Sequence, residues 1–532
     1  MIIDLCYKKW YSADNLHVKG YCFDSKSEIC ENESLCQLFS PVCDEESLLN
    51  VLNEANGIFC VLIDKPNFKA IVMDKTRVYP LFFRQEENDF RISDDPYALL
   101  NENDVQNPEG VAEYKNLYVT VGNGTLIKDI LQAQPLHYTL FSNGKWTQKP
   151  YYTYCVKQEE IISIDYDEAF RVALDKTFKR LVQYADGRQL VVPLSGGYDS
   201  RLILCMLKEC GYENIICYTV GREGSADAIN ARDVASRLGY EHYFIDNCNP
   251  DIVSRYKSEK RFEDYYRFAG SLSGFIFMFE YFALKELTEK GVIGKDAFFV
   301  PGHSGDFLGG SQLTKASVKN NFSGRKLVNS VIGIIWSKNE IENSVERKVF
   351  FDKIRKTVEQ KYEESYLPHS ILDAVVMEIK LTRFINNAPR IYEFFGYQVL
   401  LPFWDNEMLD FFKRLPLEMK LYNRFYNQYL SDYLFKKYDV DITHRRLQAN
   451  NFRINLQIVK NKIKRLLPER MINALASGED SVGYDEMTKP LKEELLLKNK
   501  QLRDDELKGN VTLMYWYLQH INEITSSNKE KN

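Results

Sequence analysis

Residues 1 to about 155 carry short apolar runs separated by polar and turn-forming residues. Runs of this kind occur at 57–64, 69–74 and 80–83. A spacing of about ten residues per run is typical of strands in stacked antiparallel sheets. The run at 137–141 is followed by Asn143-Gly144, a pair that accepts the positive φ angles of a type I′ turn. This part of the chain therefore predicts a β-sandwich that contains a hairpin.

The period changes after about residue 165, where segments with helical spacing alternate with continuous apolar runs. This rhythm predicts a parallel sheet with ligands at the carboxyl ends of its strands. The rest of the chain, to about residue 525, is mostly helical in pattern. The predicted helices are 166–184, 201–210 and 226–238, and the predicted strands are 189–194, 214–220 and 241–245.

These patterns divide the chain into a front domain (1–155), a sheet-and-helix domain (160–440) and a helical C-terminal extension (441–532), as a length of 532 residues allows. The net charge of −6 is spread along the chain, which argues against a protein dedicated to nucleic acid. The 11 cysteines include no CxxC pair and are expected to be reduced, mostly buried thiols. No signal peptide or membrane span is predicted, so we expect a cytoplasmic protein.

The strongest candidate for chemistry is the segment 194–201, Leu-Ser-Gly-Gly-Tyr-Asp-Ser-Arg, set between a predicted strand and a predicted helix. Gly196 and Gly197 allow the backbone to approach phosphate oxygens closely, and the helix that follows adds its positive end. Ser195 and Ser200 supply hydroxyl donors. We expect a phosphate-binding loop that differs from the Walker loop, because the Gly-x-x-x-x-Gly-Lys-Ser/Thr pattern is missing.

This loop resembles the pyrophosphate loop of the N-type ATP pyrophosphatases, which cleave ATP between the α and β phosphates. The resemblance implies ATP and Mg2+ as cofactors, with Asp199 as a metal ligand. The stretch 225–235 is similar to the one after the adenine-binding strand of asparagine synthetases. By that resemblance, the backbones of Leu194 and Val220 contact adenine.

The stretch 297–310 resembles the second signature of the asparagine synthetase family, Ser-Gly-x-Gly-x-Asp-Glu. The resemblance makes Asp306 the second magnesium ligand and Gly302 a nucleotide-binding residue. His303 stands where asparagine synthetases carry a glutamate and β-lactam synthetases a tyrosine. We expect His303 to act as the base on an incoming amine or to orient the substrate, or to be only a hydrogen-bonding turn residue.

The sequence departs from the family pattern in two places, and both departures bear on the identity of the substrate. The segment 396–405 resembles the family pattern Gly-x-Glu-x-Arg-x-Pro-Phe-x-Asp, but Gln398 and Leu400 occupy its Glu and Arg positions. The catalytic lysine of the family is not identified, although Arg445 or Arg446 is a candidate for its place.

The segments 57–60 and 74–82 resemble the Gly-x-Phe-Ala and Arg-Asp-x-x-Gly-x-x-Pro-Leu-Tyr signatures of the glutaminase half of asparagine synthetases. That half uses a cysteine exposed as the new N-terminus. This chain has Ile2 there, and Cys6 lies four residues later, so we expect an inactive front domain. The fold implied is an Ntn-hydrolase-like β-sandwich, then an adenine-nucleotide α-hydrolase-like synthetase domain with a helical C-terminal part.

The segment 444–470 is rich in Lys and Arg. It is expected to be a solvated helix face, with peripheral contact to anionic lipid or to RNA as alternatives.

The resemblance implies a ligase that adenylates a small-molecule carboxylate and joins it to an amine. The amine is ammonia, an amine on the substrate, or nitrogen from a glutaminase or other supplying partner. The setting is surface-polysaccharide or small-molecule biosynthesis. The alternatives are a catalytically inactive scaffold and a nucleic-acid-modifying ATP pyrophosphatase.

Overall fold

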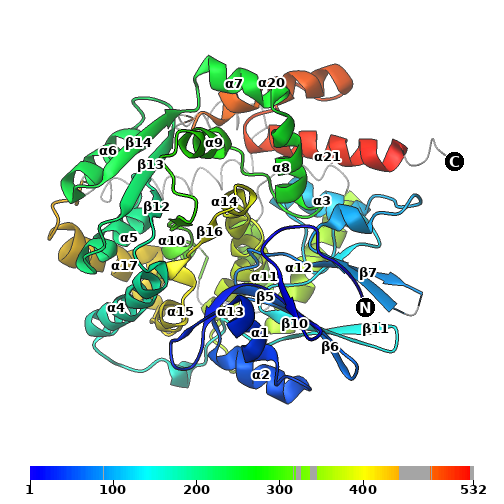
Figure 1. The fold of residues 1–532 in the computed structure, drawn as a ribbon, viewed down its shortest axis with the longest axis horizontal. Helices are drawn as coiled ribbons and strands as arrows, with labels where there is room; N and C mark the ends of the chain where they lie inside the picture. Colours follow the sequence, from blue (N-terminus) through cyan, green and yellow to red (C-terminus); the bar gives the residue numbers. More distant parts are fainter. Residues whose placement is uncertain are drawn as a thin grey trace.

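The computed structural model describes residues 1–87, 89–315, 317–318, 325–335, 344–442, 480 and 482–527. A two-sheet sandwich lies beside a parallel sheet flanked by helices (Figure 1). The predicted α/β fold class, with a β-sandwich followed by a parallel-sheet domain, is confirmed. The segment 444–470 and the candidates Arg445 and Arg446 lie outside the described residues.

The front sandwich consists of a four-stranded sheet and a seven-stranded sheet. The first has the order β1 (Ile2–Asp4), β8 (Asp89–Ser93), β7 (Phe82–Glu86), β9 (Leu131–Gln132). The second has the order β11 (Lys145–Pro150), β10 (His137–Ser142), β6 (Phe68–Met73), β5 (Asn56–Lys65), β3 (Leu16–Phe23), β2 (Tyr11–Ala13), with β4 (Ile29–Glu31) paired to β3. Its helices are α1 (Asn32–Phe39), α2 (Glu45–Glu54), η1 (Pro96–Leu99) and α3 (Pro108–Leu117).

Strand β5 shows how the sequence builds these layers. Ile58, Cys60 and Leu62 belong to the main hydrophobic core, together with the strand residues of the four-stranded sheet. Phe59, Val61 and Ile63 belong to a second core, which α1 and α2 close. Because successive side chains of a strand point to opposite faces, a continuous apolar run marks a strand buried on both sides.

The predicted hairpin is present, with φ of 51° at Asn143 and 67° at Gly144 between β10 and β11. Most boundaries agree with the prediction to within one residue, but two elements start further away. Strand β7 begins at Phe82 rather than residue 80, because a buried turn ends only there. Helix α5 begins at Tyr198 rather than residue 201, because Gly197 is its N-cap.

The second part is built around a five-stranded parallel sheet in the order β14 (Glu241–Asp246), β13 (Ile215–Gly221), β12 (Leu190–Pro193), β15 (Phe298–Phe299), β16 (Gln398–Val399). Its helices are α4 (Tyr166–Ala185), α5 (Tyr198–Glu209), α6 (Ala226–Leu238), α7 (Pro250–Ser258), α8 (Lys260–Gly270), α9 (Tyr281–Glu289), α10 (Gly305–Gly309), α11 (Arg325–Ile335), α12 (Ser344–Lys361), α13 (Pro368–Val376), α14 (Arg390–Phe394), α15 (Asn406–Lys413), α16 (Leu417–Lys420), α17 (Arg424–Tyr429), α20 (Tyr484–Lys498) and α21 (Asn510–Ser527). Single turns of other helix types are η2 (Gln158–Glu160), η3 (Met377–Leu381), η4 (Ile385–Asn387), η5 (Pro402–Trp404), η6 (Leu421–Asn423) and η7 (Leu430–Phe435).

The strand order reverses at the centre of this sheet. The chain runs outward from β12 through β13 to β14 and then returns to the other side of β12 with β15. Loops that leave two neighbouring strands in opposite directions open a crevice at their carboxyl ends, which is where open α/β sheets bind ligands. The loops after β12 and β15 carry the two segments singled out in the sequence.

The described part of the C-terminal extension packs on both other parts. Helix α20 lies against α7, and α21 lies against α20 and α3 (Figure 1). The Tyr517 hydroxyl is 2.9 Å from the Tyr97 hydroxyl and accepts from the backbone N–H of Leu272.

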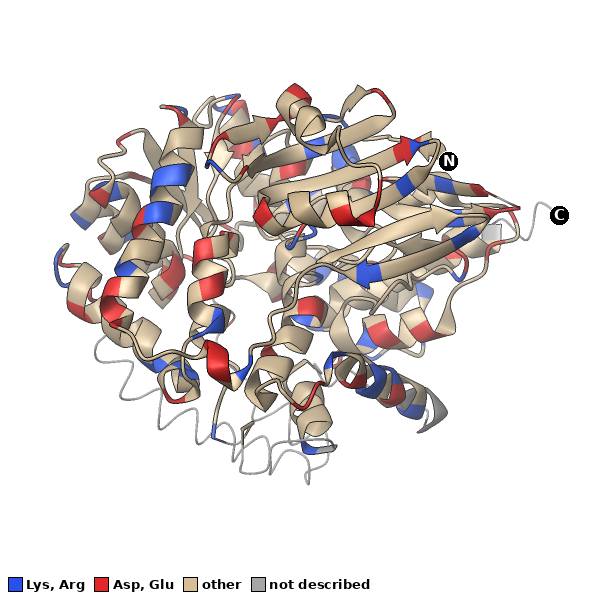
Figure 2. Ribbon diagram, turned by 90° about the horizontal axis from the view of Figure 1, so that it is seen from below, with Lys and Arg blue, Asp and Glu red and all other residues tan. Residues whose placement is uncertain are grey.

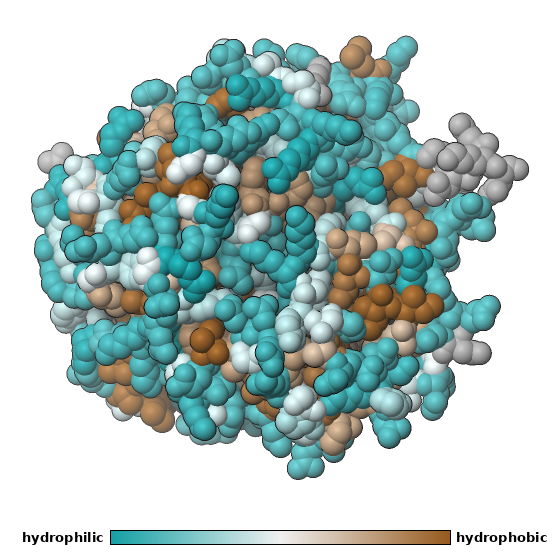
Figure 3. Space-filling view, viewed as in Figure 1, coloured by the Kyte–Doolittle hydropathy of each residue, from teal (hydrophilic) through white to brown (hydrophobic). Residues whose placement is uncertain are grey.

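Lys and Arg alternate with Asp and Glu over the ribbon seen from below (Figure 2), and the face seen in Figure 3 is mostly hydrophilic with scattered apolar patches. Within the described ranges, no helix is both long enough and apolar enough to cross a membrane.

Candidate active site

The loop after β12 is held by its own polar atoms. The Ser195 hydroxyl accepts from the backbone N–H of Gly197 at 3.2 Å and lies 3.3 Å from the Ser200 hydroxyl. The buried Arg201 guanidinium donates to the carbonyls of Gly196 and Val440, both at 2.9 Å. The loop therefore has a fixed shape, with the start of α5 behind it. Such an arrangement of N–H groups and hydroxyls is suited to phosphate oxygens.

The loop after β15 lies directly against this one. A Cβ on Gly302 would come within 2.7 Å of the Ser200 nitrogen, and a Cβ on Gly305 within 2.7 Å of the Asp199 carboxyl carbon. The backbone N–H of Asp306 donates to Asp199 at 3.0 Å. Glycine is required at both positions because the two loops touch there. The structure thus brings Asp199, Ser200, Gly302 and Asp306 together.

Asp199 forms no ion pair among the described residues and is held by hydrogen bonds instead. The Tyr426 hydroxyl, from α17, donates to its second carboxylate oxygen at 2.8 Å. Burial, and after it the neighbouring Asp306 carboxylate, raises the pKa of Asp199 to about 8. A carboxyl group in this position is protonated near neutral pH unless a cation replaces the proton.

Lys380 and Tyr426 are site residues that sequence reasoning missed. Lys380 lies in the π-helical turn η3. Burial lowers the pKa of its ammonium group, and the Asp306 carboxylate acts in the opposite direction. Within the described part of the chain no hydrogen bond or ion pair fixes its ammonium group. The π-turn, a local feature often found at functional sites, leaves no signature in the sequence.

His303 follows Gly302 on the loop that contacts Ser200. Its Nδ1 atom is buried and has no hydrogen-bond partner among the described residues. Burial lowers the pKa of the His303 imidazole to about 4, so the ring is neutral at pH 7. A neutral imidazole with an uncommitted nitrogen can accept a proton or a hydrogen bond from a substrate.

Leu194 and Val220 lie at the ends of the neighbouring strands β12 and β13. The Leu194 N–H donates to the carbonyl of Tyr218 at 2.8 Å, and the Leu194 carbonyl accepts from the Thr219 hydroxyl at 2.6 Å. The Leu194 carbonyl thus has one lone pair left for a base. Asp227 and Asn230 of α6 reach the same edge, since a Cβ on Gly196 would come within 2.9 Å of Asp227.

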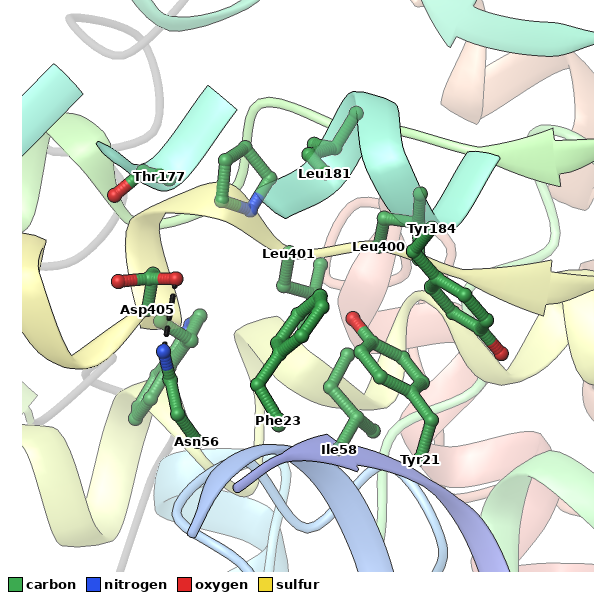
Figure 4. A pocket seen from close by; sticks show the side chains of 13 residues that line it. Tyr21, Phe23, Asn56, Ile58, Thr177, Leu181, Tyr184, Leu400, Leu401 and Asp405 are labelled. Carbon is green, nitrogen blue, oxygen red and sulfur yellow. Dashed lines mark hydrogen bonds between the residues drawn. The ribbon is translucent and has the colours of Figure 1, made fainter. Parts of the chain in front are cut away.

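The segment 396–405 connects this site to the front sandwich. Asp405 is the N-cap of α15, accepts two hydrogen bonds from Arg180 at 2.6 and 3.0 Å, and accepts a third from Asn56 of β5 at 3.0 Å (Figure 4). The Trp404 indole N–H donates to the Ser304 hydroxyl, next to His303. Leu400 and Leu401 line a cavity of about 30 Å³ between the two parts, which has room for about one water molecule.

The front sandwich does not bring a comparable group together around Ile2 or Cys6. The Asp94 carboxylate accepts from the backbone N–H groups of Cys6 and Tyr7 and from the indole of Trp10. Burial raises the pKa of the Cys6 thiol, so the thiolate is disfavoured. Half of the Ile2 side chain is exposed on an edge strand.

The donor set around Asp199 fits a magnesium ion that also binds phosphates. Among the described residues, no three or more His, Cys, Asp or Glu side chains converge as a metal site. Mg2+ is usually bound by one or two carboxylates together with substrate phosphates and water. Asp199 and Asp306, with a phosphate loop beside them, match that requirement, whereas a site for a tightly held structural metal needs more protein ligands.

Residues 169–273 match the family model for asparagine synthase. The chain is 28% identical over 266 residues to a "Probable asparagine synthetase [glutamine-hydrolyzing]" of Acanthamoeba polyphaga mimivirus. That match covers 47% of this chain and 44% of the viral protein, so the chain spans less than half the length of this relative.

Two solved structures are similar at low level: an allosteric regulatory enzyme of purine biosynthesis (10% identity, TM-score 0.18, 44% of this chain and 62% of that one) and the glutamine phosphoribosylpyrophosphate amidotransferase from B. subtilis complexed with ADP and GMP (11%, 0.18, 44% and 72%). At these TM-scores they carry no argument. The fold is instead given by the strand order described above. The match to the asparagine synthase model thus covers residues 169–273, the part of the chain that contains the first of the two facing loops.

Proposed function

We propose that this protein is an ATP-dependent ligase that adenylates a carboxylate, releases pyrophosphate and joins the activated carboxylate to an amine. The observation that carries the proposal is the contact between the two loops, which sets Asp199 against Asp306 at the edge of a phosphate cradle. A phosphate loop alone is compatible with many nucleotide enzymes. Two carboxylates facing each other beside it suit the departure of a highly charged pyrophosphate.

The residues of the phosphate-binding loop and its neighbours have different proposed roles. Ser195, Gly196, Gly197 and Ser200 hold phosphate oxygens, and the rigid loop keeps the α-phosphorus in line with an attacking carboxylate. Asp199 and Asp306 hold Mg2+, which neutralises charge on the leaving pyrophosphate when it is bound. Lys380, which interacts electrostatically with Asp306, adds a positive charge on the same side.

The backbones of Leu194 and Val220 receive adenine, and Gly302 lets the second loop approach the nucleotide. His303 acts on the amine. Because its pKa is lowered to about 4, the imidazole is a weak base and does not deprotonate a free ammonium ion. It takes up the proton that becomes acidic as the amine nitrogen forms its bond to the acyl carbon.

The nitrogen comes from ammonia, from an amine on the substrate, or from a partner that supplies it. The front sandwich is proposed to lack glutaminase activity, because burial raises the pKa of the Cys6 thiol and the neighbouring Asp94 carboxylate is already engaged by three donors. Gln398 and Leu400 stand where the family pattern has Glu and Arg, which supports a carboxylate substrate other than aspartate.

The test is pyrophosphate release from Mg·ATP with a panel of carboxylates and ammonia, comparing wild type with Asp199→Asn. Asp104→Asn is the matched control, because Asp104 is a buried carboxylate that pairs with Arg84 in the front sandwich. Carboxylate-dependent release that disappears only in Asp199→Asn supports the ligase. Absence of Mg·ATP binding in the wild type would contradict the proposal and favour an inactive scaffold, whereas release that depends on RNA would favour a nucleic-acid-modifying enzyme.

A further inference from the structure

Three arginines are buried together where the front sandwich meets the helical part of the molecule. Arg77 lies in the turn between β6 and β7, and Arg383 and Arg390 lie between η3 and the start of α14. Each is no more than 2% exposed. The Asn386 side-chain amide donates to the Thr76 carbonyl at 3.0 Å, which ties the two segments to each other.

The partners of these arginines are neutral. Arg77 donates to the side-chain oxygens of Gln132 at 2.7 Å and Ser273 at 3.1 Å. Arg390 donates to the Ser271 hydroxyl at 2.6 Å, and its guanidinium stacks 4.2 Å from the ring centre of Phe268. Neutral oxygens satisfy hydrogen bonds, but they leave the charge without a counter-ion.

Several donor atoms of the cluster have no partner among the described residues. They are the Nε atoms of Arg77 and Arg390 and all three nitrogens of Arg383. A guanidinium stays protonated at any pH at which proteins fold, so Arg383 keeps its charge in the interior. Burying a charge with no partner is among the most costly arrangements in a protein.

The nearby carboxylates are already committed. Glu378 and Glu113 lie close enough to act on Arg383 electrostatically, but Glu378 pairs with Lys361 at 2.5 Å and Glu113 pairs with Lys353. Within the described ranges, no carboxylate reaches ion-pair distance of any of the three arginines. Burial, and after it the charges of Arg383 and Arg390, lowers the pKa of Arg77, as expected for like charges held together.

The backbone conformation at Arg77 is costly for a residue with a side chain. Its φ is 60°, in the left-handed region that costs a residue with a Cβ more than it costs glycine. In the pattern Arg-Asp-x-x-Gly-x-x-Pro-Leu-Tyr, which the segment 74–82 resembles, the position of Arg77 is the glycine. The strained arginine therefore adds a positive charge to the junction where an unstrained residue would fit.

We propose that Arg77, Arg383 and Arg390 form a binding site for a small oxyanion, a carboxylate or a phosphate. Water molecules would satisfy the unpaired N–H groups but would not offset the three charges. The planar fork of Arg383, with every nitrogen available, matches the two oxygens of a carboxylate or phosphate group. Because Arg77 belongs to the sandwich and the other two belong to the helical part, the bound anion joins the two parts. This site is separate from the phosphate loop and does not depend on the proposed ligase reaction.

The test is calorimetric titration of the full-length protein, in a buffer of low anion content, with sodium acetate, sodium phosphate and sodium chloride in separate runs. The wild type is expected to bind one oxyanion per chain with saturation, and the acetate and phosphate runs identify which chemistry the site prefers. Arg383→Met and Arg77→Gly are expected to weaken this binding at least about tenfold, since each removes a charge that faces the anion.

Arg180→Met is the matched control, because Arg180 is an arginine only 11% exposed whose charge is offset by Asp405, and it should leave the anion affinity unchanged. Arg77→Gly also guards against a folding defect, because glycine suits the backbone at that position. No saturable binding to wild type would overturn the proposal. Binding that survives unchanged in both variants would also overturn it, and would assign the anion to the loop between Ser195 and Ser200.

Discussion

Asp74 and Asp94 of the front sandwich differ in their neighbours from Asp199 of the parallel-sheet part. In the sandwich, Asp74 accepts hydrogen bonds from Phe59, Thr76 and Arg77, and Asp94 accepts from three donors of its own. In the parallel-sheet part, Asp199 faces a second carboxylate, and the Nδ1 of His303 has no partner in the described structure. Asp199 also accepts hydrogen bonds, from Tyr426 and from the N–H of Asp306, so the difference lies in the second carboxylate, which makes this pair available to a cation.

The largest effect that this contrast predicts is on catalysis by Asp199. Asp199→Asn is expected to lower pyrophosphate release about 1,000-fold, because a metal ligand contributes several kcal/mol to the transition state. The same variant should unfold at an equal or higher temperature at pH 8. Folding raises the pKa of this carboxyl, so the wild type loses stability as pH rises from about 4 to about 8. A marked fall in unfolding temperature would contradict the contrast.

Replacement of Asp74 is expected to lower stability and to leave nucleotide binding unchanged. Asp74→Ala is expected to destabilise the protein by about 3 kcal/mol, because it leaves several buried N–H groups without an acceptor. Chemical denaturation measures this loss, and Mg·ATP affinity in the folded variant should stay at the wild-type value. A loss of nucleotide affinity with no loss of stability would show that the front sandwich takes part in the chemistry.

Substitution of His303 tests the amide-forming step of the proposed reaction. His303→Gln is expected to slow amide formation about 100-fold while carboxylate-dependent exchange of pyrophosphate into ATP persists, because the first step does not use the imidazole. The rate should not change near pH 6.5 on account of this group, since its pKa is lowered to about 4 and it is neutral throughout that range. Equal loss of both activities would assign His303 to the nucleotide instead.

The smallest expected effect is the pH dependence of Mg·ATP binding. The proton on Asp199 must leave before the carboxylate can hold the metal, so affinity should rise up to about tenfold per pH unit toward pH 8 and level off above it. Calorimetry at several pH values measures this slope, with Asp199→Asn as the variant in which it should vanish. An affinity independent of pH between 6 and 8 would mean that Asp199 does not bind the ion.

Local patterns in the sequence predicted much of the fold. Helix α6 spans the predicted residues 226–238, because its apolar spacing, the Ser225 cap and the terminal Gly239 agree. The hairpin at Asn143 was predicted from an equally local pattern, the Asn-Gly pair. Helices α1 and α2 were missed in the front part, since eight to ten residues between strands give a weak periodic signal.

The site was predicted only where it is contiguous in sequence. The loop 194–201 and the stretch 297–310 each carry a readable motif, and the strand order places them together. Lys380 and Tyr426 come from elements with no such motif, so only tertiary packing brings them to Asp306 and Asp199. The roles of all these residues stay predictions until the variants are measured.

The contacts of Asp405 have a practical consequence for anyone who wants to shorten this protein. Asp405 follows Trp404, whose indole fixes the loop that holds His303, and it is clamped between Arg180 and a strand of the sandwich. The neighbouring Asn406 accepts a hydrogen bond from the Lys75 ammonium group and donates its backbone N–H to the Asn56 side chain. Whatever chemistry the first 155 residues have or lack, they hold the segment 396–405 in place, and Trp404 of that segment contacts the loop that carries His303. A trimmed chain that starts at α4 would keep the loops 194–201 and 297–310 and lose the surface against which the segment 396–405 packs.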